Sequence, residues 1–221
     1  MPEKLKTQRG MTIVELILAL GVALMTLILL VNMHKNASDD LKAKRSADYL
    51  LTFTQAASRY AAANRDGLVK AMRNDSASQT DFCTSTVNLA LSGKTSYTCV
   101  TDLARLISKN ALPASFAGST NAYGQTLSAI FKLANPASGS ELANGDNQDV
   151  EILVVANNGV PITQTSELGL AVELLGGVGG FVPPAGTSGL CPAGKEVCGP
   201  GWASTLADFG ACRKGVDAGC N

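Results

Sequence analysis

The chain carries one unbroken apolar run close to its N-terminus. Residues 11–33 read MTIVELILALGVALMTLILLVNM and contain a single charged side chain, Glu15. A helix of this length, at about 1.5 Å per residue, crosses the hydrocarbon core of a bilayer. The run therefore predicts a membrane-spanning helix, and it separates a short N-terminal stretch, residues 1–10, from the more polar remainder of the chain.

A helical pattern continues beyond the apolar run. Apolar residues recur at spacings of three and four as far as Ala61, with charged and amide side chains between them. No Gly or Pro occurs between Val22 and Arg65, and residues 64–67 predict the end of the helix. The spacing is not a sustained heptad repeat, which argues against a coiled coil. We expect one helix from Met11 to about Asn64, apolar on all sides in its first half and on one side in its second.

The rest of the chain predicts a small α+β head. Short helices are expected at residues 101–109 and from Thr165 to a stop at Gly176-Gly177. Strands are expected at residues 126–133, 150–155 and 181–182, with a polar loop at 135–149 and a turn at 157–159. Strands connected in this way favour an antiparallel sheet packed against the long helix.

All six cysteines follow the apolar run, and their even number indicates an oxidising compartment. This places residues 1–10 in the cytoplasm and the remainder beyond the membrane. The cysteines fall into three local pairs, Cys83 with Cys99, Cys191 with Cys198 and Cys212 with Cys220, although six cysteines allow 15 connectivities. A zinc site on the last four cysteines is the competing interpretation, but their spacings are wider than those of usual zinc knuckles.

Charge and composition argue against several functions. The chain has 18 Lys and Arg against 18 Asp and Glu, whereas nucleic-acid binding needs a basic surplus. The single histidine, His34, lies at the membrane edge and leaves no base for a Ser or Cys nucleophile. The glycines of residues 176–180 lack the Lys-Ser/Thr of a phosphate loop, and Asp146, Asp149 and Glu151 are interpreted as solvated surface in preference to a calcium site. We expect no enzyme activity, cofactor, metal or nucleic-acid partner.

The basic stretch with Lys4, Lys6 and Arg9 resembles the start of a secretory signal, but the following run is too long and no small-x-small cleavage site follows it. Glu15 is also unusual, because a carboxylate about one turn into hydrocarbon is costly. A passive signal anchor is the simplest alternative, with the Glu15 side chain bending toward the headgroups.

The residues around Glu15 carry a specific motif. Arg9-Gly10, then Met11-Thr12-Ile13-Val14-Glu15 and the apolar run resemble the class III signal of type IV pilins and pseudopilins. The resemblance implies that a prepilin peptidase cuts after Gly10 and methylates Met11. It also implies that Glu15 pairs with the N-terminal amine of a neighbouring subunit during assembly, which would offset the desolvation of its charge. Met in place of Phe at the first processed position favours the type IVb branch.

A second set of motifs follows in order along the head. These are Leu112-Pro113-Ala114-Ser115-Phe116, residues 121–126, Val154-Val155, residues 179–182 and residues 201–206. Together they resemble the pilin-like N-terminal domain of the PilV minor pilins, the shufflon tip adhesins of conjugative thin pili. We interpret residues 121–126 as a turn leading into a strand, not as a binding site. In that family a long C-terminal region recognises lipopolysaccharide, and this chain, which ends at Asn221, is expected to lack it.

The expected organisation is an α+β, type IV pilin-like chain in four parts. These are a cleaved leader at residues 1–10, a membrane and filament-core half-helix at 11–33, a head at 34–182 that includes the amphipathic half of the helix, and a Cys/Gly/Pro-rich tail at 183–221 that depends on its disulfides.

By resemblance, the chain is a minor pilin of a conjugative type IVb pilus. It would be stored in the inner membrane with its head in the periplasm, and then assembled into, or at the tip of, an extracellular filament. The implied partners are prepilin peptidase, other pilin subunits, the inner-membrane assembly platform and the lipopolysaccharide of recipient cells. The alternatives are a type II secretion pseudopilin and an uncleaved bitopic protein with a periplasmic binding domain.

Overall fold

A computed structural model of the chain describes residues 13–91, 94–134, 149–162, 165–183 and 189–212. It divides into two units, residues 1–41 and residues 42–221. The first unit contributes the N-terminal part of helix α1 (Ile13–Ala63), and the second contains the rest of that helix and the whole head. The predicted long helix is therefore present, and its end lies within one residue of the expected position.

The two parts of α1 differ in exposure as the sequence pattern predicts. Every side chain from Ile13 to Ser38 is exposed. Within the second unit, α1 buries one stripe of mainly small and aromatic residues. The members of that stripe are Ala43, Ser46, Ala47, Phe53, Ala56, Ala57, Tyr60 and Ala61.

The segment after α1 differs from the expectation. A second helix, α2 (Arg65–Met72), follows α1 after a single intervening residue, Asn64, so Gly67 lies inside a helix instead of ending one. A Cβ atom on Gly67 would lie 2.2 Å from the ring of Phe82, at the end of α3 (Ser76–Phe82). The glycine is there because α3 packs too closely on α2 to leave room for a side chain.

The central sheet has four antiparallel strands in the order β1 (Ser85–Leu91), β2 (Lys94–Asp102), β3 (Thr126–Leu133) and β4 (Val150–Asn157). The prediction for β3 is confirmed at both ends, and β4 extends two residues beyond the predicted strand. β1 and β2 were not predicted. Asp102 ends β2 and caps α4 (Leu103–Ser108), so this helix is shorter than expected.

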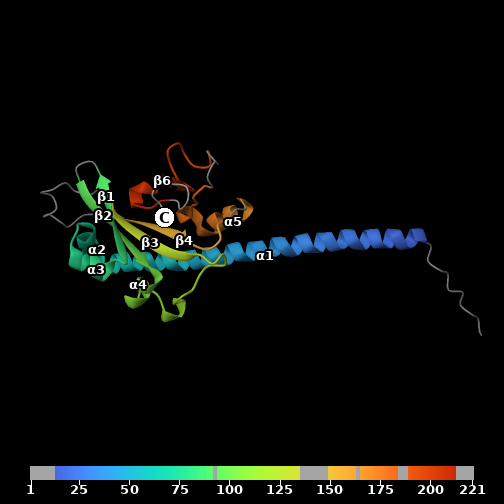
Figure 1. Cartoon of the computed structure of the whole chain (residues 1–221), viewed down its shortest axis with the longest axis horizontal. Coiled ribbons are helices and arrows are strands. Elements are labelled where there is room, and N and C mark those ends of the chain that lie inside the picture. The colour runs from blue at the N-terminus through green and yellow to red at the C-terminus, as the bar shows by residue number, and fades with distance from the viewer. Residues whose placement is uncertain (1–12, 92–93, 135–148, 163–164, 184–188, 213–221) are drawn as a thin grey trace, which may run out of the picture. The chain divides into compact units, whose positions relative to one another are not determined.

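Side chains of β3 alternate between two buried layers. Its odd-numbered residues, from Leu127 to Leu133, pack in one cluster with Phe53 and Tyr60 of α1. Ile130 belongs to a second cluster on the other face, with Leu153 of β4. Val197, Leu206 and Phe209 of the C-terminal segment complete that cluster. The sheet is therefore covered on both faces, by helices on one side and by the C-terminal segment on the other (Figure 1).

The C-terminal part contains α5 (Thr165–Leu175), which ends at Gly176 with a φ of 64°, as the glycine pair predicts. The expected strand at residues 181–182 is wrong, because Phe181 makes only an isolated bridge to Cys198 before Pro183, which has no amide hydrogen to donate. Two short strands, β5 (Val197–Gly199) and β6 (Trp202–Ser204), form an unexpected hairpin. Single-turn 3₁₀ helices lie at Ala114–Phe116, Gly176–Val178 and Ala207–Phe209.

Candidate functional site

The first candidate site is the apolar part of α1. Its side chains are open to the surroundings, with Ile13 79% exposed, Met25 72% and Leu30 66%. An 18-residue window has a mean hydropathy of 2.7, and none of that window is buried. By length and composition this helix could cross a membrane, a test that N-terminal signal sequences also pass. A helix that is apolar on every side needs lipid or protein around it.

Glu15 lies in the first turn of α1, between the exposed side chains of Val14 and Leu16. A carboxylate in this position is favoured by the partial positive charge of a helix N-terminus. The predicted cleavage site, Gly10-Met11, lies outside the described residues. Cleavage and the assembly role of Glu15 therefore stay predictions.

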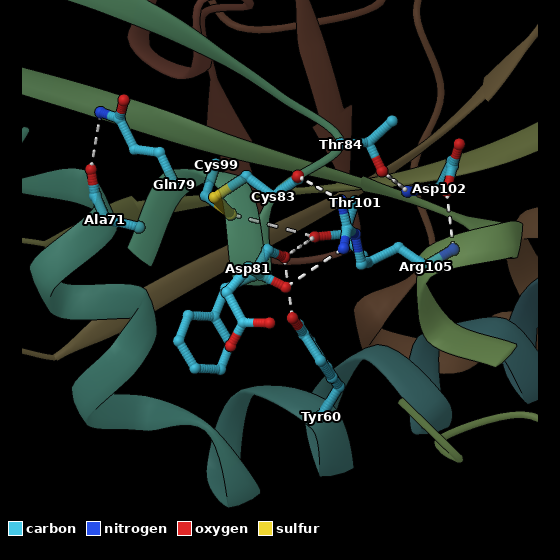
Figure 2. The surroundings of a disulfide bond; sticks show 11 residues. Tyr60, Ala71, Gln79, Asp81, Cys83, Thr84, Cys99, Thr101, Asp102 and Arg105 are labelled. Atoms are coloured by element: carbon cyan, nitrogen blue, oxygen red, sulfur yellow. Dashed lines mark hydrogen bonds between the residues drawn. A yellow bond between two sulfur atoms is a disulfide. The ribbon is translucent and has the colours of Figure 1, made fainter. Parts of the chain in front are cut away.

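The second candidate site is the disulfide between Cys83 and Cys99, whose Cα atoms are 5.2 Å apart (Figure 2). Cys83 lies two residues before β1 and Cys99 lies in β2, and both residues are buried. The bond closes a loop of 16 residues. Loop-closure entropy alone gives a stabilisation of about 3 kcal/mol for a loop of this length.

Donors from α1 and α4 converge on the backbone just before this disulfide. The Tyr60 hydroxyl donates to the carbonyl oxygen of Phe82 at 2.7 Å. The guanidinium of Arg105 donates to the carbonyl oxygens of Asp81, at 3.2 Å, and Cys83, at 3.0 Å. Figure 2 shows the two side chains approaching from different helices. They satisfy carbonyl groups that the end of a helix leaves without partners.

Burial and charge set the electrostatics of this cluster. Burial raises the pKa of Tyr60 to about 12, partly opposed by the nearby positive charge of Arg105 and reinforced by Asp81. The carboxylate of Asp81 pairs with Lys109, at 2.6 Å. At the other end of α3, hydrogen bonds from Ser78 lower the pKa of Asp75, the N-cap residue. Both ends of α3 are therefore fixed by specific polar contacts.

The second disulfide, between Cys191 and Cys198, joins the C-terminal segment to β5. Because these two sulfurs bond to each other, they cannot be the thiolate ligands of the competing zinc site. The indole of Trp202, the first residue of β6, donates to the carbonyl oxygen of Gly179 at 3.1 Å. The third predicted pair, Cys212–Cys220, stays a prediction because Cys220 lies outside the described residues.

Residues 121–126 form a turn into β3, as expected from the sequence. The Asn121 side-chain oxygen accepts from the backbone amides of Tyr123 and Gln125, each at 2.9 Å. The Tyr123 hydroxyl donates to Glu167 at 2.9 Å and so ties this turn to α5. The segment thus has a structural task within the head.

A pocket of about 530 Å³ lies between α4 and the start of β3. Its walls include the apolar side chains of Leu103, Ile107 and Leu127. The hydroxyls of Ser108 and Ser119 at its edge are bonded to the backbone carbonyls of Arg105 and Phe116. The pocket therefore offers mainly apolar contacts.

Sequence reasoning missed the Tyr60–Arg105 cluster. Tyr60 was recognised only as an apolar position of the long helix, and nothing local links either residue to the carbonyls around Phe82. The one local indication was Asp102, a helix-capping residue type that predicts the start of α4. Its side chain accepts from the Arg105 amide.

The layout joins an N-terminal helix of 51 residues, a four-stranded antiparallel sheet packed on its second part, and two disulfides. This combination fits a pilin-like α+β fold. No protein-family model, curated protein or solved structure matches the chain.

Proposed function

We propose that this chain is a pilin-like filament subunit, specifically a minor pilin of a type IVb conjugative pilus. Prepilin peptidase removes residues 1–10, and the inner membrane stores the subunit with its head in the periplasm. The assembly platform then moves it into, or to the tip of, an extracellular filament.

One observation carries the proposal. The exposed apolar segment Ile13–Met33 contains one charged residue, Glu15, and it continues without a break into a helix that packs on a disulfide-bonded head. A passive anchor needs no carboxylate at this depth, whereas a subunit that pairs with a neighbour's terminal amine does. The Gly10-Met11 motif directly before the segment supplies the site at which that amine would form.

The decisive experiment is the intact mass of the purified chain from cells with and without a prepilin peptidase. We expect loss of residues 1–10 and gain of one methyl group only where the peptidase is present. Reduction should add about 2 Da for each disulfide. An unprocessed mass beside an active, compatible peptidase would remove the proposal in favour of an uncleaved bitopic protein.

Two variants separate processing from assembly. Gly10→Val should leave the longer precursor in the membrane, because a branched side chain obstructs the close backbone approach that a glycine permits. Glu15→Val should be cleaved normally but be depleted from sheared surface filaments at least about tenfold, since the charge that pairs with the neighbouring amine is gone.

Leu18→Val is the matched control, because it changes a neighbouring exposed apolar side chain without changing charge. Normal recovery of Glu15→Val in filaments would reject the assembly role. Absence of the unmodified chain from surface filaments, despite cleavage, would favour a secretion pseudopilin.

A further inference from the structure

The neutral net charge of this chain conceals a strong division of charge within the head. Residues 42–133 carry eleven Lys and Arg against five Asp and Glu, and residues 134–221 carry three against nine. The two halves therefore have formal charges of about +6 and −6 at neutral pH. Such an asymmetry of charge between the two halves of a chain affects how the protein associates with other molecules.

Among the described residues, the fold places much of this charge in different layers, with Lys132, which lies over the Phe209 ring, and the exposed Lys195 as exceptions on the C-terminal side. Helices α1, α2 and α4 cover one face of the sheet, and α5 and the C-terminal hairpin lie on the other side (Figure 1). Arg45 and Arg59 are exposed on α1 and Lys70 is exposed on α2. These three residues define a surface that we call the basic face.

Arg45 and Arg59 lie on one stripe of α1, opposite the sheet. They are 14 positions apart in the sequence, and Asp48, Thr52 and Gln55 occupy exposed positions between them at helical spacing. Neither arginine makes an ion pair with another residue in the described ranges. The basic face therefore offers charge that the fold itself does not use.

The other side, which we call the acidic face, is marked by Asp149 at the start of β4 and Glu173 on α5, both exposed. Neighbouring carboxylates have tasks inside the head. Glu151 pairs with Lys132 at 2.9 Å, and Glu167 accepts from Tyr123. Asp149 and Glu173 form no ion pair within the part of the chain that the structure describes, so they are available to a partner.

We propose that the basic face of one copy docks on the acidic face of a second copy of this chain. Opposite potentials on two surfaces steer their encounter and fix their orientation. Because the two faces are different surfaces, the contact is heterologous, and repetition of it makes an open row instead of a closed dimer. This inference rests on the proposed filament role and assigns the head surfaces that would meet in it.

The test uses the full chain in a neutral detergent, with self-association followed by analytical ultracentrifugation. Association should weaken strongly between about 50 mM and 500 mM salt, because the screening length falls by about threefold. The variant D149K/E173K reverses the charge at the two positions that mark the acidic face, and R45E/R59E reverses it at the two arginines of the basic face. Each alone should associate roughly five- to tenfold more weakly.

An equimolar mixture of the two variants should restore association, since the introduced lysines of one variant meet the introduced glutamates of the other. D40K is the control: Asp40 belongs to the first unit, before the head, so this variant makes the net charge more positive without changing any residue that marks either face. Equal weakening by this control, no recovery in the mixture, or insensitivity to salt would each overturn the proposal. Cleavage after Gly10 should be unchanged in every variant, so a failed contact is distinguishable from a failed pilin assignment.

Discussion

Tyr60 links the long helix to the backbone beside the first disulfide through one hydroxyl group. It is 1% exposed, and its hydroxyl makes the shortest hydrogen bond to the Phe82 carbonyl. Without it the Phe82 carbonyl would keep only the long contact from the Thr101 hydroxyl, at 3.5 Å, and a buried carbonyl without a good partner costs about 1–3 kcal/mol. This residue therefore has an effect larger than its single contact suggests.

The raised pKa of Tyr60 gives a stability change at high pH. Its pKa is about 12 in the folded chain against an ordinary value near 10, so folding favours the protonated hydroxyl. The stabilisation is complete below about pH 10 and is lost as the pH rises toward 12. Denaturant unfolding of the full chain at pH 8 and at pH 11 would measure this loss.

Tyr60→Phe is the control for this measurement. It should lower the free energy of unfolding at pH 8 by about 1–3 kcal/mol and should show a smaller further fall at pH 11. An equal fall in both proteins would mean that lysines or other tyrosines cause the pH dependence.

Individual residues show which features the local sequence reveals and which it does not. Asn157-Asn158-Gly159 was recognised as a turn, and Asn158 and Gly159 have φ angles of 61° and 64°. Arg105 could not be assigned from the sequence, because its acceptors lie 22 and 24 residues earlier in the chain. Partners at that separation become neighbours only through the fold.

Among the elements, α2 and α5 contain glycines with opposite surroundings. A Cβ atom added to Gly67 of α2 would lie 2.2 Å from the Phe82 ring, and the Lys109 ammonium lies over that ring. Gly169 of α5 has no atom within 4 Å of such a Cβ. Gly67 therefore leaves room for a closely packed ring, whereas Gly169 only lowers the helix propensity of α5.

Substitution of these two glycines should have opposite effects. Gly169→Ala should raise the free energy of unfolding by up to about 1 kcal/mol, through higher helix propensity. Gly67→Ala gains the same propensity but must displace the Phe82 ring, and we expect a net loss of about 1–2 kcal/mol. Chemical denaturation of both variants would measure the difference, and a stabilising Gly67→Ala would show that the ring moves freely.

The elements that the sequence predicted are those with a clear period. The long helix and β3 carry regular apolar patterns, and both were placed within two residues. β1 and β2 were missed because Ser, Thr and Asn interrupt their apolar positions, while their pairing register depends on contacts between distant residues. The β5–β6 hairpin was missed because Gly, Pro and Cys dominate its sequence and only Trp202 and a few apolar residues hold it in place.

For the whole molecule, the main contrast is between an exposed apolar segment and a head with buried layers on both faces of its sheet. The segment 13–33 contributes no side chain to the buried clusters. A change within it should therefore alter membrane retention without altering the stability of the head.

Leu24→Arg tests this separation. Leu24 is 56% exposed near the middle of the apolar run, and an arginine there costs about 2.5–3.5 kcal/mol of membrane insertion. We expect a large loss from carbonate-washed membranes with an unchanged thermal midpoint for the head. Leu41→Arg, at an exposed leucine beyond the run, should be retained normally, and full retention of Leu24→Arg would contradict a spanning role.

The C-terminal layer also has a consequence for the order in which the molecule is made. A Cβ on Gly210 would lie 3.0 Å from the side chain of Val87, so the final segment closes against the first strand. At ribosomal rates of about 5–20 residues per second, these two residues are synthesised roughly 6–25 s apart. In the later part of that interval, once they have been synthesised, Ile130 and Leu153 await the residues that cover them. Such a head completes its folding only after residues 197–210 have been translated, and loss of the codons for these residues would leave this face of the sheet without its cover.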